Sequence, residues 1–227
     1  SCGTKSLKVT ATSVLGEEAS AASSFSVAGC DGIDFNPSLE LNTDATTTDT
    51  PTGVGVRVSN DIGAARISRE PAHFKELVVR LPQGFALATG GADAIASCTD
   101  AQFGMGSREA NACPSESEVG DISIVTPVLG RFEGHAYLGA VNGNRYGLLL
   151  ESGGARPEGT PGHLRIKLKG EITLNPSDGS IQGTFSDLPQ VPVSTFELKF
   201  HGGPGALVST PLHCGSYSAS VGASSWA

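Results

Sequence analysis

The chain has 227 residues, with 30 glycines, 13 prolines, few aromatic residues and a formal net charge of -8 at pH 7. This negative charge argues against binding to nucleic acid or to anionic lipid, because both require a basic patch. No apolar run approaches the roughly 20 residues of a membrane-spanning helix, which argues against membrane insertion. The expected partners are proteins, sugars or cations.

Residues 1–31 are predicted to form a short β connector. Two segments in it, residues 7–12 and 24–29, alternate apolar and polar residues as half-buried strands do, and a flexible stretch joins them. The chain begins SCGTK, without an initiator methionine or a signal sequence, which predicts a processed piece of a secreted protein. A disulfide between Cys2 and Cys30 would staple the two strands into a hairpin-like unit.

Residues 32–213 are predicted to form the main domain. Strand-like segments follow one another through it, at residues 54–60, 74–87, 119–127, 131–139, 145–152, 162–176, 181–189 and 195–211. The turn at residues 175–180 is too short for a crossover, so it predicts an antiparallel pair. Strands at this spacing predict an all-β fold, an antiparallel β-sandwich or flattened barrel with a disulfide-linked β connector at its N-terminus.

One helix is expected in this domain, at residues 92–103 with Asp93 as its cap. Cys98 near its end is followed by a polar, glycine-containing loop that leads to Cys113. This spacing does not resemble a zinc site, because it includes neither a CxxC motif nor a close pair of histidines. We therefore predict a Cys98–Cys113 disulfide, which contributes about 3 kcal/mol in the loop-entropy description.

Residues 214–225 resemble residues 2–13. Aligning Cys214 with Cys2 also matches five further identities, Gly215 with Gly3, Ser218 with Ser6, Val221 with Val9, Ala223 with Ala11 and Ser225 with Ser13. In a repeating chain, equivalent sequence meets an equivalent neighbour. Residues 214–227 are therefore predicted to start the next connector, with an unpaired terminal strand and with Cys214, Gly215, Tyr217 and Trp226 at an inter-repeat joint.

The five cysteines leave the pairing of Cys214 open. If Cys2 pairs with Cys30, Cys214 is left for a cysteine of the next unit. The alternative pairs Cys30 with Cys214, which ties the ends of the main domain together and leaves Cys2 free.

Several motifs occur together, in order: FNPSLE, ELVVRLPQGF, SCTDAQF, ACPSESEVGDI, GHAYLG and DLPQVPVSTFELKFHGGPGALVSTPLHCGSY. This ordered set resembles the repeat unit of large secreted multi-repeat proteins found mostly in actinobacteria, and the resemblance covers most of residues 30–220. It implies a repeat architecture and a surface setting. It implies no activity and no catalytic residue.

Candidate chemistry is sparse in this sequence. The carboxylates of Glu116, Glu118 and Asp121 lie close together in the sequence, as a glycosidase acid and nucleophile would in space, but a solvated loop explains them better. The histidines show no HExxH or HxH spacing, which argues against a zinc site; they are His73, His135, His163, His201 and His213. No cofactor is expected. Calcium is the metal that the aspartate-containing loops favour, and its weak candidate ligands are Asp31, Asp34, Asp44 and Asp49.

The sequence thus predicts a non-enzymatic structural repeat of an extracellular or cell-surface tandem array, a stalk, fibre or surface layer whose units join head to tail. Its expected partners are neighbouring copies of the same repeat. The alternative is an adhesin module that binds calcium, a glycan or a cell-surface protein, and a glycoside hydrolase is a remote third hypothesis. A glycan platform needs several exposed aromatic side chains, whereas Trp226 lies in the repeated segment, where packing at the joint is favoured.

Overall fold

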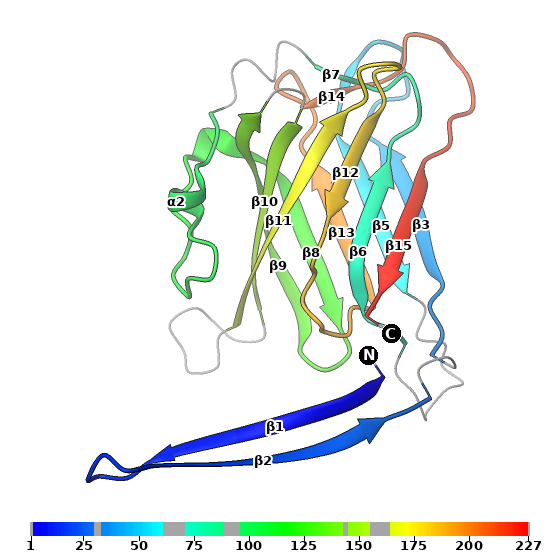
Figure 1. Ribbon diagram of the computed structural model, residues 1–227. Helices are drawn as coiled ribbons and strands as arrows, with labels where there is room; N and C mark the ends of the chain where they lie inside the picture. The colour runs from blue at the N-terminus through cyan, green and yellow to red at the C-terminus, as the bar shows by residue number, and fades with distance from the viewer. Residues whose placement is uncertain are drawn as a thin grey trace.

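The structure is a computed structural model that describes residues 2–29, 33–60, 71–88, 96–142, 145–154 and 164–226. Two parts are visible in Figure 1: a two-stranded hairpin at the N-terminus and a barrel-like domain formed by the rest of the chain. The hairpin consists of β1 (Gly3–Thr12) and β2 (Glu18–Val27). Among the described residues, no helix is long and apolar enough to cross a lipid bilayer.

One antiparallel sheet makes up most of the barrel. In spatial order its strands are β15 (Ser220–Ser225), β6 (Phe74–Arg80), β12 (Ile181–Phe185), β11 (Leu164–Leu174), β10 (Arg145–Gly154), β9 (Gly130–Asn142), β8 (Glu118–Thr126), β13 (Thr195–Phe200), β5 (Val54–Asn60) and β3 (Pro37–Thr43). The two edge strands, β15 and β3, contact each other, so the sheet curls into a nearly closed barrel. The all-β prediction is confirmed. Of the two predicted architectures, a β-sandwich and a flattened barrel, the structure is the barrel.

Three short strands form a separate small sheet at one end of the barrel: β4 (Pro51–Thr52), β14 (Val208–Ser209) and β7 (Ala86–Leu87). The only helical segments among the described residues are α2 (Asp100–Phe103) and the 3-10 turn η2 (Ser115–Ser117).

Alternation of apolar and polar residues explains why these segments fold as barrel strands. In β5, Val54, Val56 and Val58 are buried in the core, while Arg57 points outward and pairs with Glu197 of β13 at 3.1 Å. A period of two places every second side chain on the same face of a sheet. The same inward set recurs around the barrel and includes Ile122, Ile124, Phe132, Leu148, Leu150, Leu198 and Phe200.

The C-terminal strand corrects one predicted boundary. The sequence places the end of the main domain at residue 213, with residues 214–227 starting the next connector as an unpaired strand. In the structure, β15 pairs with β6 of the same barrel over residues 220–225. The main sheet therefore extends beyond residue 213, because β6 offers a free edge for this strand.

The predicted helix is also corrected. Of residues 92–103, only Asp100–Phe103 are helical within the described part, and the predicted cap Asp93 lies outside it. Thr99 is the N-cap of α2. Its hydroxyl accepts a hydrogen bond from the Gln102 backbone N–H, and the Gln102 side chain accepts one from the Thr99 backbone N–H. This is a capping box, which satisfies two backbone donors at the start of the turn.

Candidate functional site

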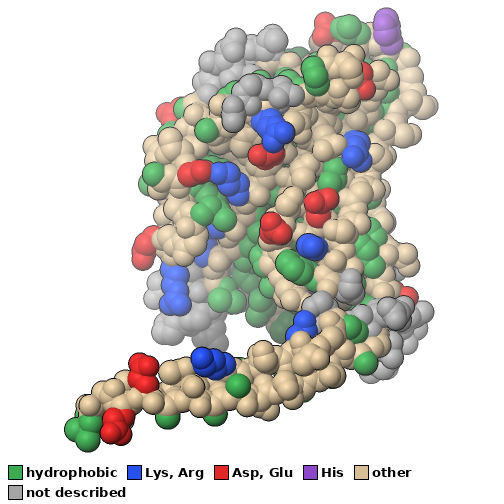
Figure 2. Space-filling view, in the orientation of Figure 1, with side chains coloured by type: hydrophobic (Ala, Val, Ile, Leu, Met, Phe, Trp, Pro, Cys, Tyr) green, Lys and Arg blue, Asp and Glu red, His purple; other side chains and the backbone are tan. Residues whose placement is uncertain are grey.

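The N-terminal hairpin has one apolar and one polar face. Cross-strand partners share a face, and the pairs Val9–Ala21 and Lys5–Phe25 lie on the same one. The apolar side chains on this face are those of Leu7, Val9, Ala11, Ala19, Ala21, Phe25 and Val27. Leu7 is 64% exposed and Phe25 is 61% exposed. Figure 2 shows hydrophobic side chains uncovered along the hairpin and at its tip.

This exposed face distinguishes the hairpin from every strand of the barrel. Apart from Lys5, which is half-buried, each described residue of β1 and β2 is exposed. A two-stranded hairpin is at best marginally stable in water unless a hydrophobic face packs against something. The hairpin thus has the pattern of an element that packs against a partner.

The segment equivalent to β1 lies in a different environment at the C-terminus. In β15, Val221 is opposite Val79 and Ala223 is opposite Leu77 of β6. Both Val221 and Ala223 are partly buried and pack against the barrel core. The same short sequence is therefore a core-covering edge strand in one position and an exposed hairpin strand in the other.

The predicted joint residues lie on this barrel. The Trp226 backbone N–H donates to the His73 carbonyl at 3.0 Å, its indole N–H donates to the Leu188 carbonyl at 3.1 Å, and Lys75 Nζ lies 5.3 Å from its ring centroid. Tyr217 packs edge-on against Phe85 and donates its hydroxyl hydrogen to the His213 carbonyl. Gly215 lies against the Tyr217 ring.

The described cysteines behave largely as predicted. Cys98 and Cys113 form a disulfide with their Cα atoms 5.0 Å apart. Cys2 is disulfide-bonded, and Cys30 lies outside the described residues. Cys214 is free and exposed, so the alternative pairing of Cys30 with Cys214 is wrong.

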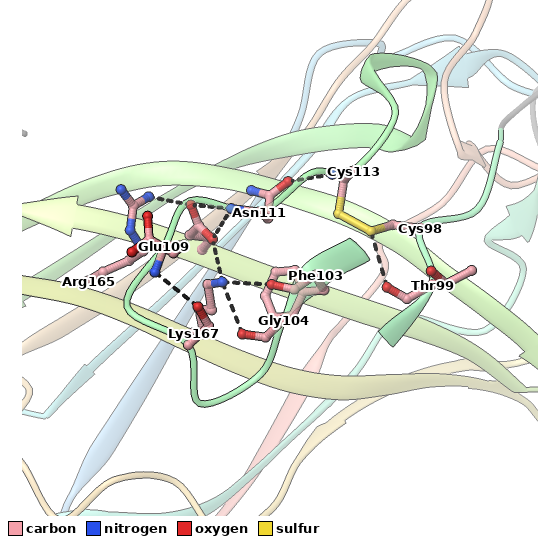
Figure 3. A network of polar contacts seen from close by, with 11 residues as sticks. Cys98, Thr99, Phe103, Gly104, Glu109, Asn111, Cys113, Arg165 and Lys167 are labelled. Atoms are coloured by element: carbon pink, nitrogen blue, oxygen red, sulfur yellow. Dashed lines mark hydrogen bonds and ion pairs between the residues drawn. A yellow bond between two sulfur atoms is a disulfide. The ribbon is translucent and has the colours of Figure 1, made fainter. Parts of the chain in front are cut away.

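The disulfide belongs to a buried polar network on the outer face of β10 and β11 (Figure 3). Glu151 of β10 accepts hydrogen bonds from Arg165 and from the Asn111 backbone N–H, and its other ion pair, with Lys167, is 3.3 Å long. Lys167 Nζ also donates to the carbonyls of Phe103 and Gly104, at 2.6 and 3.1 Å. These bonds clamp the end of α2 and the loop after it onto the barrel wall.

The same network surrounds a buried tyrosine. Tyr137 of β9 packs with Cys98, Phe103 and Leu149 in a small second core. Burial raises the pKa of the Tyr137 phenol, and the nearby negative charges of Glu118 and Glu151 raise it further, although a hydrogen bond with the Asn111 side chain works in the opposite direction. Because its ionisable groups are enclosed and paired with one another, the network acts as a structural anchor.

A second polar group lies on the barrel exterior, beside a groove that Asp121 and His135 line. Glu118 and Asp121 of β8 meet His135 of β9, whose Nδ1 is 3.2 Å from Glu118 Oε1 and 3.3 Å from Asp121 Oδ1. His201, which follows β13, places Nε2 3.2 Å from Asp121 Oδ2. Glycine at position 120 permits this convergence, because an added Cβ there would lie 2.3 Å from the Lys199 carbonyl oxygen of β13.

Within the described ranges, Glu118, Asp121 and His201 are the only three metal-ligating side chains close enough to hold one ion. Although no short spacing links His135 and His201 in the sequence, adjacent strands bring both to the carboxylates of Glu118 and Asp121. Sequence spacing could not show this, because β13 reaches β8 only through the sheet topology. Glu116 is outside the group, and its carboxylate accepts a hydrogen bond from Ser115.

The weak calcium candidates are not brought together in this way. Asp31 lies outside the described residues. The Asp34 carbonyl accepts from the Ala72 backbone N–H, and the Asp49 backbone N–H donates to Pro211. The Asp44 carboxylate lies against the backbones of Gly53 and Gly202, a close approach that glycine allows at both positions. These contacts fit turn formation, the ordinary role of aspartate in loops.

Apolar side chains pack the barrel core. One apolar cavity of about 80 Å³ lies near the loop after β12, lined by residues that include Phe74, Phe185, Leu188 and Val191. Pockets that hold drug-sized ligands have volumes of about 300–1,000 Å³. This cavity is therefore too small for a lipid-sized ligand.

No protein-family model matches the sequence. No curated protein matches it either. The search of solved structures likewise gives no match.

Proposed function

We propose that this chain is a non-enzymatic structural repeat of an extracellular tandem array, a stalk, fibre or surface layer whose units join head to tail. One observation carries the proposal: a single sequence motif serves as the core-covering strand β15 and, as β1, forms part of a hairpin with an unpartnered apolar face. The N-terminal copy of the motif, β1, has an apolar face that needs a partner, whereas the C-terminal copy, β15, already packs on a barrel. This combination is expected of a chain in which each repeat contacts its neighbours.

Other features support the proposal. A disulfide stabilises the barrel, as is common in proteins of oxidising compartments. The buried charges of Glu151, Arg165 and Lys167 pair with one another, and Lys167 holds the end of α2 against the barrel. The motif set of residues 30–220 resembles secreted multi-repeat proteins, which have the same implied architecture.

The natural polypeptide, purified from its source, tests this function. We expect its intact mass to exceed that of one barrel several-fold, and electron microscopy to show barrels arranged in line. A natural polypeptide that contains a single barrel would overturn the array.

The second candidate function is a cation-binding adhesin module, and the convergence of Glu118, Asp121 and His201 favours it. An imidazole nitrogen beside carboxylate oxygens suits zinc and related transition metals, whereas calcium prefers oxygen ligands alone. Tetrahedral zinc with bonds of about 2.0–2.1 Å places its ligand atoms roughly 3.3 Å apart. The His201–Asp121 separation of 3.2 Å is compatible with this geometry.

Titration calorimetry of the chain with zinc and with calcium tests this second function. We expect zinc to bind and calcium not to, and we expect His201→Ala or Asp121→Asn to weaken zinc binding at least about tenfold. Glu133→Gln, which changes a carboxylate in the same groove outside the three-residue group, is the matched control. Zinc binding that is the same in all variants would exclude this site.

A further inference from the structure

We infer that β1 and β2, residues 3–27, form a donor hairpin that docks on the β6 edge of a second copy of this chain, where β15 lies in the present copy. This inference rests on the proposed tandem array and names the contact that joins its units. It is a case of β-strand addition, in which a strand from one unit extends the sheet of another.

The register of the contact follows from β15. Position by position, Val9 corresponds to Val221 and Ala11 to Ala223. Since Val221 is opposite Val79 and Ala223 is opposite Leu77, β1 is expected to place Val9 opposite Val79 and Ala11 opposite Leu77 of the acceptor copy. A shift by one residue would turn every side chain to the other face.

The faces also match. Val221 and Ala223 point toward the barrel core, and their counterparts Val9 and Ala11 lie on the apolar face of the donor hairpin. Docking in this register directs Val9, Ala11 and the exposed Leu7 of β1 toward the acceptor core. The polar face, which carries Thr4, Ser6, Lys8, Thr10 and Thr12 on β1, stays in solvent.

The donor hairpin cannot dock in this way on its own barrel, because β15 already pairs with β6 there. The strand that pairs with β6 of an acceptor copy must therefore be β1 of the copy that follows it in the array, and this β1 takes the place of β15. In a continuous array the two are the same strand: the strand that completes one barrel is the first strand of the next hairpin.

The orientation of the units follows from the strand directions. β15 runs toward the end of the barrel at which β3 begins, where both termini lie in Figure 1. A docked β1 would run the same way, and β2, which is antiparallel to it, would return the chain to the opposite end of the acceptor. The donor barrel then begins there with its own β3, so the units stack head to tail.

One cross-strand pair opposes docking between identical copies. Lys8 corresponds to Ser220, which is opposite Arg80, so the contact brings two cations together. Like charges directly opposite each other in a sheet are destabilising. We therefore expect Lys8→Ser, which restores the residue found in β15, to strengthen the contact.

A tandem chain tests the donor hairpin. Residues 1–213 are followed directly by residues 2–227, so that residues 2–13 of the second copy replace residues 214–225 of the first. The first copy carries Val79→Cys and the second carries Val9→Cys. Antiparallel partners have Cα separations of about 4.5–5.5 Å, within the roughly 4.4–6.8 Å that a disulfide spans. We expect mass spectrometry of non-reduced peptides to show a disulfide between the two substituted positions in most molecules.

Two controls fix the register. Thr10→Cys in place of Val9→Cys puts the thiol on the opposite face and is expected to leave position 79 unbridged. In the single chain, Val221→Cys with Val79→Cys is expected to form a bridge. Hydrogen exchange provides a second readout: β1 amides of the second copy are expected to exchange at least about tenfold more slowly than those of the single chain, and more slowly still with Lys8→Ser.

The donor-hairpin inference is wrong if the tandem chain forms no disulfide between position 79 of the first copy and position 9 of the second, or if its first barrel does not fold. This result is distinguishable from failure of the proposed function. If the natural polypeptide contains many barrels but the tandem chain forms no bridge, the array is supported and the donor-hairpin contact is wrong. If the natural polypeptide contains a single barrel, the array is wrong whatever the result with the tandem chain.

Discussion

At the scale of single residues, Glu151 is the clearest case of a charge that the fold must compensate. It is 7% exposed, and its carboxylate lies between the guanidinium of Arg165 and the ammonium of Lys167. Such groups are stable in a protein interior only when they are paired, because removing one partner leaves an uncompensated buried charge.

We therefore expect Glu151→Gln to lower the free energy of unfolding by about 3 kcal/mol, measured by urea denaturation. Glu171→Gln is the matched control. Glu171 pairs with Arg145 at 3.4 Å, but both side chains are more than half exposed, so the expected loss is below about 1 kcal/mol. Equal losses in the two variants would contradict a buried, anchoring role for Glu151.

Tyr137 gives a prediction for alkaline pH. Burial raises the pKa of its phenol in the folded chain, so the folded state holds the proton more tightly than the unfolded state does. The associated stability is present below the ordinary tyrosine pKa of about 10 and is lost as pH rises through the higher folded value.

Tyr137→Phe removes this titration. We expect the variant to lose less stability than the wild type between pH ~8 and pH ~11, as measured by thermal or urea unfolding. The control is Tyr217→Phe, in which the exposed tyrosine is changed and the wild-type pH dependence is expected to persist. If Tyr137→Phe follows the wild-type curve, the buried phenol is not its source.

At the scale of secondary-structure elements, β1 and β15 have similar sequences but lie in different environments. They share valine and alanine at corresponding positions, yet Val221 packs against the barrel core while Val9 is 56% exposed. Hydrophobic stabilisation depends on apolar area removed from water, so the same side chain contributes differently in the two strands.

The pair of substitutions Val9→Ser and Val221→Ser measures this difference in the single chain. We expect Val221→Ser to reduce the free energy of barrel unfolding by about 1 kcal/mol, and Val9→Ser to change it by no more than about 0.5 kcal/mol. Chemical denaturation followed by tryptophan fluorescence is suitable, because Trp226 adjoins β15 on the barrel. A larger loss from Val9→Ser would show that the hairpin supports its own barrel.

At the scale of the whole molecule, the barrel is almost closed while the N-terminal hairpin and the Cys214 thiol stay accessible. The two edge strands, β15 and β3, approach each other without pairing. Exposed sheet edges are common sites of association. Cys214 is free and exposed near the start of the repeated C-terminal segment.

We expect mild oxidation to convert the purified chain into a disulfide-linked dimer, because two exposed thiols can meet without rearrangement of the barrel. Non-reducing electrophoresis and intact mass measure this product. Cys214→Ser should stay monomeric under the same treatment, and a dimer of that variant would place the reactive thiol elsewhere.

The sequence by itself predicted those features that depend on neighbouring residues. Alternation of apolar and polar residues identified most of the barrel strands, although not β3 or β4, and the short connection at residues 175–180 identified an antiparallel pair, β11 with β12. The spacing from Cys98 to Cys113 identified the disulfide. Residues 96–99 of the predicted helix are not helical, because the Thr99–Gln102 capping box, itself a local sequence signal, starts α2 at Asp100.

Only the tertiary structure decided which distant segments meet. β13 lies between β8 and β5, so His201 reaches Asp121, a contact that no spacing in the sequence encodes. β15 pairs with the edge of β6, so the main sheet continues past the boundary predicted at residue 213. Strand pairing between remote segments depends on which edges remain free after the other strands have paired, and that is a property of the assembled sheet rather than of either segment.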